Sequence, residues 1–303
     1  MKTKKSVIRT VPSLLFIVLY TAYLLIFSDR AKADAAEGLR LCAGVILPAV
    51  FPFSVASSLI VSSGLCGVLG KYVGRPLSAL LGLSGSGAGV FFLGLVGGYP
   101  TGASSCARLY RDNAVSKAEA EALVSYTNNA TPAFSAVFIG SLLGSRRAGF
   151  AVYLSCIASA FLWGLLLRRK TGQRVSNAAA SGGSDLSSCV ASAARSAVVI
   201  CADVVVFSII SGALSAVPYC GAVSALPELT NGAVKLSGII SDPRLRGAAV
   251  CALTSFSGLC VMDQVCGVCR EAGLSARYYV IGKPIQALFS FFAFYLSYPL
   301  FSS

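Results

Sequence analysis

The chain has 303 residues, of which 55% are hydrophobic and 12% charged, and its mean hydropathy is +0.75. A soluble domain is about a quarter charged. This deficit, with several apolar runs of about twenty residues, argues against a soluble enzyme and indicates a membrane protein. The net charge of +13 comes without an arginine- and aromatic-rich patch or a zinc spacing. We therefore expect no nucleic-acid partner.

The chain contains no histidine and eleven cysteines. The lack of histidine excludes Ser-His-Asp and Cys-His catalysis and removes the commonest metal ligand. An odd number of cysteines, most of them within apolar runs, predicts small buried hydrophobes and not a disulfide framework. Cys266 and Cys269 form one C-x-x-C pair, which alone is a weak indication of a metal site. We expect a protein that is not an enzyme and uses neither metal nor cofactor.

The apolar segments lie, in chain order, at residues 11–27, 40–63, 77–110, 123–145, 148–167, 189–217, 246–269 and 279–301. The first follows a basic start and reads as a retained helix. A signal peptide is the alternative, because "AKA" at 31–33 resembles a cleavage site. The segments predict four parts: an N-terminal membrane helix and loop (1–37), a first repeat (38–167), a flexible basic linker (168–188) and a second repeat (189–303).

The lysines and arginines indicate how these segments cross the membrane. If every segment before the linker spans, eight basic residues fall inside and ten outside. If 77–110 enters the membrane and returns to the same side, thirteen fall inside and five outside. Cytoplasmic loops are enriched in Lys and Arg, so we expect 77–110 to be re-entrant and the N-terminus to be cytoplasmic. Whether 246–269 is re-entrant or spanning stays open.

The stretch "GLVGGYPTGAS" (94–104) interrupts the re-entrant segment. Proline and glycine disfavour a helix interior, and the backbone groups they free must be covered by protein or face a water-filled cavity. A packing kink and a binding site at the tip of a broken helix are equally good interpretations. For the second, the substrate-binding candidates are Gly97, Gly98, Tyr99, Pro100, Thr101 and Gly102.

A second break, "YTNNATPAF" (126–134), places Asn128, Asn129 and Thr131 in a segment long enough to span. Their side chains can hydrogen-bond across helices. Alternatively, Thr131 can cap a half-helix that begins at Pro132. The proximity of the first break raises the odds that these three residues bind a substrate.

Two further patterns concern helix starts and interruptions. Ser116 and Glu119 predict a capping box, with a helix starting near Lys117, and this pattern is structural only. Pro48 and Pro52 lie close enough to predict an interrupted helix, which either flanks the same cavity as the breaks or is a mere kink.

The two halves resemble each other weakly. "FLGLVGGYPTGASS" (92–105) can be laid over "ALTSFSGLCVMDQV" (252–265), and the offset of 160 residues there is close to the 154 residues that separate Phe53 from Phe207. A near-constant offset predicts an internal duplication. An odd number of crossings between the halves makes the repeats inverted, a recurring design of secondary transporters.

The second-half stretch adds Gly258 and Gln264 to the substrate-binding candidates. Asp263 lies in the same apolar run, and acids inside a membrane mark ion pathways by default. We therefore take Asp263 as the candidate ion-coupling residue. Asp203 is also in an apolar run, but it lies two helical turns after Arg195, so we expect it to pair with Arg195 or to lie near the membrane interface.

"LPAVFPFSVASSLI", "GLVGGYPTGAS", "EAEALVSYTNNATPAFSAVFIGSLL" and "FSGLCVMDQV" resemble, in order and spacing, the YlbJ-like family of sporulation integral membrane proteins, which carry the nucleoside recognition or Gate domain. The resemblance covers roughly residues 38–300. Gly97 stands where the family would have serine, and Arg108 takes the place of an expected lysine. The family motif falls on Gly98, Tyr99, Pro100, Gly102, Ala103, Asn128, Thr131, Pro132, Gly258 and Gln264.

The resemblance implies a multi-pass protein of the mother-cell or forespore membrane of a Firmicute, needed for the spore cortex or coat. We expect an all-α polytopic membrane protein, with two inverted repeats, broken or re-entrant helical hairpins and about six to eight membrane segments. Its partners would be the bilayer, an unidentified small solute or ion, and a second copy or spore-assembly proteins. A transporter or channel-like component and a non-transporting scaffold remain the two alternatives.

Overall fold

Every regular element is a helix in the computed structural model, which describes residues 2–72, 75–168 and 185–300. The elements of the first half are α1 (Lys2–Ile26), α2 (Ser28–Leu41), the π-helical turn η1 (Cys42–Ile46), α3 (Leu47–Ser62), α4 (Leu65–Tyr72), α5 (Arg75–Leu81), α6 (Gly85–Gly97), α7 (Thr101–Arg111), α8 (Lys117–Thr127), the π-helical turn η2 (Phe134–Ile139), α9 (Gly140–Leu142) and α10 (Arg146–Leu167). Those of the second half are α11 (Leu186–Ser215), η4 (Val223–Ala225), α12 (Leu229–Ile239), α13 (Pro243–Phe256), α14 (Gly258–Glu271), α15 (Arg277–Ser297) and η5 (Tyr298–Leu300). Most of the predicted linker, 169–184, lies outside the described residues.

Five helical stretches of the described chain are long and apolar enough to cross a membrane: Ser28–Ser62, Arg146–Leu167, Leu186–Ser215, Pro243–Glu271 and Arg277–Leu300. Large apolar side chains lie exposed along them, among them Leu154, Leu162 and Leu166 of α10. Such a surface suits contact with lipid. The prediction of an all-helical, polytopic membrane protein is confirmed.

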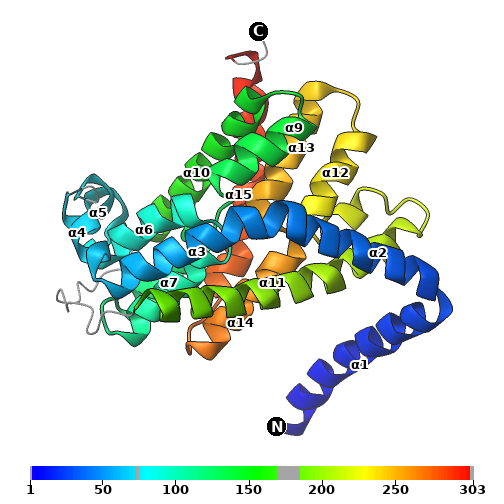
Figure 1. Cartoon of the computed structure of the whole chain (residues 1–303), viewed down its shortest axis with the longest axis horizontal. Coiled ribbons are helices and arrows are strands. Elements are labelled where there is room, and N and C mark those ends of the chain that lie inside the picture. The colour runs from blue at the N-terminus through cyan, green and yellow to red at the C-terminus, as the bar shows by residue number, and fades with distance from the viewer. Residues whose placement is uncertain (1, 73–74, 169–184, 301–303) are drawn as a thin grey trace.

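α15 is the centre of the bundle and packs against α13, α10 and α8 (Figure 1). On one side, α2 and α3 run along α11, while α1 extends away from the bundle and contacts α2 (Figure 1). Residues far apart in sequence therefore meet around α15.

The expected interruption at Pro48 and Pro52 is absent, and the helix continues from α2 through η1 into α3. Proline lacks an N–H and clashes with the preceding turn. The wider π-helical turn at Cys42–Ile46 shifts the hydrogen-bond ladder just before Pro48. The turn thus accommodates Pro48 at the start of α3, while Pro52 lies inside α3, which continues through it.

The segment predicted to be re-entrant folds back on itself. α6 and α7 pack along each other on either side of Gly98–Pro100. With 13 and 11 residues, they are about 20 and 17 Å long at ~1.5 Å per residue, shorter than the ~30 Å hydrocarbon core of a bilayer. This geometry fits a hairpin that enters and leaves on one side.

The second-half break has a different shape. α13 and α14 meet at Ser257 but do not pack along each other as α6 and α7 do. Together they form one broken helix among the stretches long enough to span. The inverted repeat therefore stays a prediction, and its two breaks differ in geometry.

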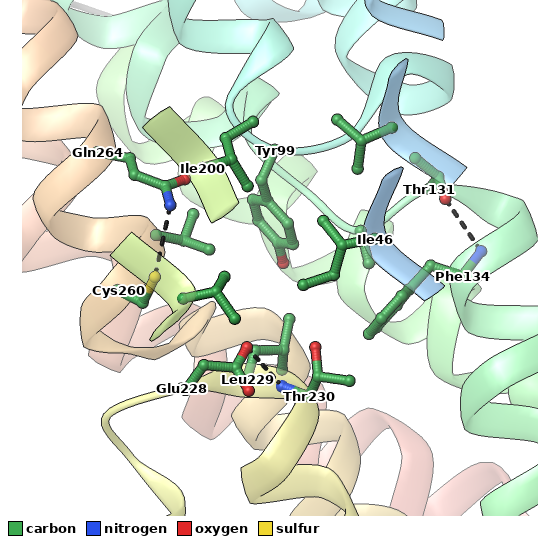
Figure 2. Close-up of a pocket in the computed structure, with 14 residues that line it drawn as sticks. Ile46, Tyr99, Thr131, Phe134, Ile200, Glu228, Leu229, Thr230, Cys260 and Gln264 are labelled. Carbon is green, nitrogen blue, oxygen red and sulfur yellow. Dashed lines mark hydrogen bonds between the residues drawn. The ribbon is translucent and has the colours of Figure 1, made fainter. Parts of the chain in front are cut away.

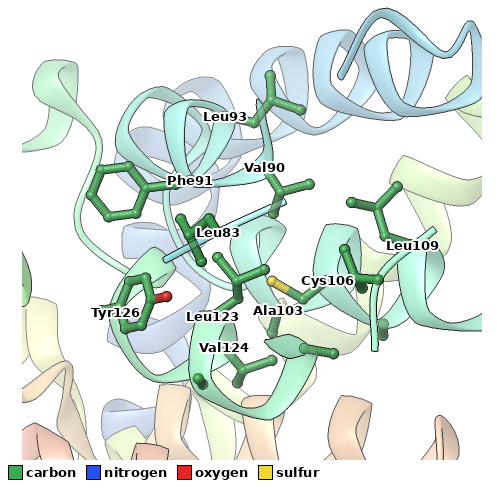
Figure 3. Packing of buried hydrophobic residues seen from close by; sticks show 14 of the residues in the cluster. Leu83, Val90, Phe91, Leu93, Ala103, Cys106, Leu109, Leu123, Val124 and Tyr126 are labelled. Carbon is green, nitrogen blue, oxygen red and sulfur yellow. The ribbon is translucent and has the colours of Figure 1, made fainter. Parts of the chain in front are cut away.

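A buried apolar cluster holds the hairpin in place (Figure 3). Leu83, Val90 and Phe91 from the α6 region meet Leu123 and Tyr126 of α8 there. Within a membrane, where lipid tails are as apolar as these side chains, such packing stabilises through close van der Waals contact. The cluster fixes the positions of both ends of the first break.

The predicted N-cap of α8 is confirmed, because the Ser116 hydroxyl accepts the Glu119 N–H at 3.2 Å. The Glu119 carboxylate does not close the capping box. It accepts the N–H and the hydroxyl of Ser84, each at 2.7 Å, and so ties α8 to the start of α6.

Candidate functional site

The glycines of the first break bring backbones close together. Gly98 has φ +73°, which favours glycine, and a Cβ there would collide with the Thr131 methyl group. Gly94 and Gly102 each lie against the carbonyl of Thr127, where a Cβ would also collide. The hairpin therefore sits directly on α8, and its glycines face protein.

The second break is closed by its own side chains. Asn128 is buried, accepts the Ala103 N–H at 2.9 Å and donates to the Val124 carbonyl at 2.7 Å. It thereby joins the start of α7 to the end of α8. The Thr131 hydroxyl accepts the Phe134 N–H at 2.9 Å, which confirms the predicted cap of the half-helix.

Asn129 is the exception in this break. It is buried and donates to the Tyr126 carbonyl at 2.9 Å, but its Oδ1 has no hydrogen-bond partner among the described residues. An unmatched buried acceptor costs about 1–3 kcal/mol. Asn129 is the one predicted binding residue here with a free acceptor.

The third break is the second-half break at Ser257, between α13 and α14, and it is covered by the chain around the start of α12. Gly258 has φ +75° and lies against the Leu229 backbone. The N–H of Leu259 donates to the Leu226 carbonyl at 2.9 Å, and that of Cys260 to Pro227, also at 2.9 Å. The N-terminus of α14 is thus satisfied by protein.

The first and third breaks meet through Tyr99. Its hydroxyl donates to the carbonyl of Thr254 at 2.5 Å, one turn before the break at Ser257. The structure therefore brings together the two interruptions that the sequence had placed in different halves.

Lys283 of α15 completes this junction. Its side chain is fully buried, and its Nζ donates to the Asn128 carbonyl at 2.5 Å. The same Nζ lies 5.5 Å from the ring centroid of Tyr99 and 5.4 Å from that of Tyr279. Sequence reasoning missed Lys283, although a lone lysine within an apolar segment was a readable signal.

A small cavity lies on one side of the junction (Figure 2). Its volume is about 60 Å³ and it is mostly apolar. A single water needs about 10–15 Å³, so there is room for a few waters or a small ion. Of the predicted residues, Tyr99, Thr131 and Gln264 line it.

Glu228 is the carboxylate of this small cavity, and the sequence had not singled it out. It caps α12 by accepting the N–H groups of Thr230 at 2.9 Å and Asn231 at 2.7 Å. Burial raises the pKa of Glu228, and these hydrogen bonds oppose that rise. Figure 2 shows Glu228 across the cavity from Tyr99.

A second cavity, of about 440 Å³, lies between α3, α7, α11 and α14. We call it the Ser/Arg cavity. Seven serines, three arginines, one threonine and one carboxylate line it: Ser54, Ser57, Ser58, Ser104, Ser105, Ser192, Ser196, Arg108, Arg111, Arg195, Thr101 and Glu271. Hydroxyls donate and accept hydrogen bonds, and guanidinium groups offer a fork of donors to carboxylate or phosphate. This composition suits a solute with an anionic group.

The hairpin tip separates the two cavities. Tyr99 lines the small cavity, whereas Pro100 and Thr101 line the Ser/Arg cavity. Thr101 also shares a hydrogen bond with Ser54 at 3.2 Å. Three consecutive residues thus form a wall between two hollow spaces.

Asp263 and Asp203, the two acids within apolar runs, lie outside both cavities. The Asp263 side chain is exposed and lines neither cavity. Asp203 does not pair with Arg195 as expected, because it interacts with Asp263 and Gln264 instead. Arg195 faces the Ser/Arg cavity. The ion-coupling role of Asp263 stays a prediction that this geometry does not favour.

Comparison with known proteins bears on the first half. Residues 43–160 match the family model Gate, described as nucleoside recognition. The chain is also similar to the sporulation integral membrane protein YlbJ of Bacillus subtilis (strain 168), with 30% identity over 127 residues. The predicted family resemblance is confirmed. The match covers 41% of this chain and 31% of YlbJ, so the chain spans under a third of that relative. No solved structure matches.

The Gate match contains the first two breaks, together with α3 and α7. It ends before α11, α14 and α15, which supply Arg195, Glu271 and Lys283. The matched region therefore accounts for one wall of the Ser/Arg cavity, and the second half supplies the other.

Proposed function

We propose that this protein forms a gated passage for a small solute that carries an anionic group. The single observation that carries the proposal is the Ser/Arg cavity of about 440 Å³ beside a broken helical hairpin. Interrupted helices at a polar site are a recurring arrangement in secondary transporters. The similarity to YlbJ, a sporulation integral membrane protein, supports a membrane location for this passage and a role in sporulation.

The charge distribution supports entry from the cytoplasm. Arg108 and Arg111 lie near the end of α7, before the loop at 112–116, which the distribution of basic residues places on the inner side. Arg195 lies near the start of α11, just after the basic linker. A positive mouth raises the local concentration of anions.

A membrane scaffold is the second candidate function, and a different observation favours it. The junction of the breaks is closed, with Asn128, Ser257 and Lys283 fully buried. A passage would have this structure in its closed state, whereas a scaffold would keep it permanently.

Uptake into proteoliposomes of purified protein separates these functions. The probes are radiolabelled phosphate and acetate, with uncharged uridine for nucleoside recognition. We expect uptake of at least one anion and none of uridine. Replacing both Arg111 and Arg195 by Gln should lower anion uptake about tenfold or more, because hydrogen bonds to charged groups contribute about 1.5–3 kcal/mol each.

The matched control replaces Arg146 and Arg147 by Gln, which removes the same charge from exposed positions that line neither cavity. This variant should transport like the wild type. Uptake of uridine alone would favour nucleoside transport, and no uptake of any probe would favour the scaffold. Unchanged uptake in the Arg111 and Arg195 variant would exclude the cavity as the site.

A further inference from the structure

Lys283 has fewer hydrogen-bond acceptors than an ammonium group can use. An ammonium offers three N–H donors, and the described residues supply one acceptor, the Asn128 carbonyl. The faces of Tyr99 and Tyr279 are its other close neighbours. No carboxylate pairs with it in the described part of the chain. A buried cation without a paired anion is costly and marks a functional site by default.

The position of Lys283 relates it to the tip of the hairpin. The Tyr99 ring borders both the ammonium and the small cavity, since Tyr99 lines that cavity and is one of the two rings near Nζ. The next two residues, Pro100 and Thr101, line the Ser/Arg cavity. A displacement of the tip, whose residues line both cavities, therefore removes one of the groups that cover Lys283.

We propose that Lys283 is an inner binding station for the anionic group of the solute, covered by Tyr99 in this closed conformation. The inference rests on the proposed passage of anions and names its second station. The Ser/Arg cavity receives the solute, and Lys283 binds its carboxylate or phosphate group once Tyr99 has moved.

When Tyr99 moves, the Lys283 ammonium exchanges a weak contact with an aromatic ring for a strong contact with an anion. Cation–π contacts contribute about 0.5–2 kcal/mol, whereas a charge-assisted hydrogen bond to an anion is short and roughly twice as strong as a neutral one. Tyr99 has to give up its hydrogen bond to Thr254 to move. The hydrogen bond from Lys283 to the arriving anion compensates for that loss. Binding of the anion at Lys283 and displacement of Tyr99 therefore occur together.

The first test measures uptake of phosphate and acetate by three variants. Lys283→Met keeps the length of the side chain and removes the charge, and it should lower uptake about tenfold or more. Lys283→Arg should restore part of it, because the charge returns. Lys117→Met, at an exposed position on α8, is the matched control and should transport like the wild type.

The second test needs no transport, so it fails independently of the proposed function. Tyr99→Ala removes the covering ring, and phosphate binding is measured by calorimetry in detergent. We expect Tyr99→Ala to bind one phosphate more per chain than the wild type, and the additional Lys283→Met substitution to abolish that gain. Melting curves and gel filtration check the fold of each variant.

Two results overturn the inference. One is a Tyr99→Ala protein that binds no more phosphate than the wild type, and the other is a gain that persists without Lys283. If the gain depends on Lys283 but the wild type takes up no anion, the station stands and the proposed passage falls.

Discussion

At the scale of single residues, Glu119 shows how burial couples the fold to pH. Its carboxylate is buried at the start of α8 and accepts two hydrogen bonds from Ser84. Burial raises the pKa of Glu119 more than these hydrogen bonds lower it. The folded protein therefore holds this proton to higher pH than the unfolded chain does.

We predict that Glu119→Gln weakens the pH dependence of stability. The unfolded chain releases the proton near the ordinary carboxyl pKa, so the wild-type free energy of unfolding falls as pH rises from there to the raised pKa. The limit of this slope is about 1.4 kcal/mol per pH unit. The apparent melting temperature in detergent, measured between these pH values, should fall less in the variant.

Ser84→Ala serves as the opposite control for this prediction. It removes a hydrogen bond that favours the charged carboxylate, so the pKa should rise further and the decline should extend to higher pH. Identical pH profiles for the wild type and Glu119→Gln would contradict the account.

The sequence predicted residue roles well where they are local. Thr131 and Ser116 cap helices that begin next to them in sequence, and such contacts depend on spacing alone. Asp263 and Lys283 depend on which side of a helix the rest of the bundle covers. A single sequence without a settled topology leaves that side undetermined, so the exposed acid was chosen and the buried lysine missed.

At the scale of elements, the Gly98 turn decides how the hairpin sits on α8. Gly98 and Gly144 both have positive φ, but a Cβ at Gly98 would collide with Thr131, whereas a Cβ at Gly144 would meet nothing within 4 Å. Gly98 combines its positive φ with a ψ of −170°, a conformation almost confined to glycine, so a substitution there adds backbone strain to the collision with Thr131.

We predict that Gly98→Ala costs about 2–6 kcal/mol, as the sum of backbone strain and overpacking. Gly144→Ala meets no neighbour within 4 Å and should cost only about 1–2 kcal/mol, from its positive φ. Apparent melting temperatures of both variants in detergent provide the comparison. Equal losses would contradict this account of Gly98.

The sequence located the breaks but not the course of the chain beyond them. Glycine and proline next to Tyr99 interrupt a helix for local reasons, and this interruption is present. Whether the next helix folds back, as α7 does, or continues, as α14 does, depends on the neighbours that cover it. Pro52 shows the converse, since it lies inside α3 and the helix continues through it.

At the scale of the whole molecule, the predicted re-entrant hairpin determines on which side of the membrane each loop lies. A hairpin that returns leaves residue 113 on the same side as the N-terminus, whereas a spanning segment would place it opposite. Residue 144 lies beyond one further crossing. The positions of these two loops therefore test the predicted topology.

We predict that an epitope inserted after Asn113 is protected in intact cells and detected after permeabilisation, because the distribution of basic residues predicts a cytoplasmic loop there. An epitope after Gly144 should be accessible from outside. Both loops have exposed residues at the chosen sites, so short insertions should be tolerated. Outside labelling at Asn113 would show that 77–110 spans the membrane.

The cavities were the least predictable part of the molecule. The Ser/Arg cavity combines Ser54, Arg108, Arg195 and Glu271, which come from four helices spread over most of the chain. Serines within apolar runs are common and carry no signal singly. Only the way α3, α7, α11 and α14 pack makes them one surface.

The glycine contacts on Thr127 have a mechanical consequence. Because Gly94 and Gly102 leave no space between the hairpin and α8, α6, α7 and α8 form one rigid unit. The tip of the hairpin contacts the second half of the chain through the hydrogen bond between Tyr99 and Thr254. A rotation of the hairpin together with α8 has to break the hydrogen bond of Tyr99 to Thr254 and also those from Lys283 and Gln286 of α15 to α8 and its end. Motions of this hinge-like kind run on about the microsecond to millisecond timescale.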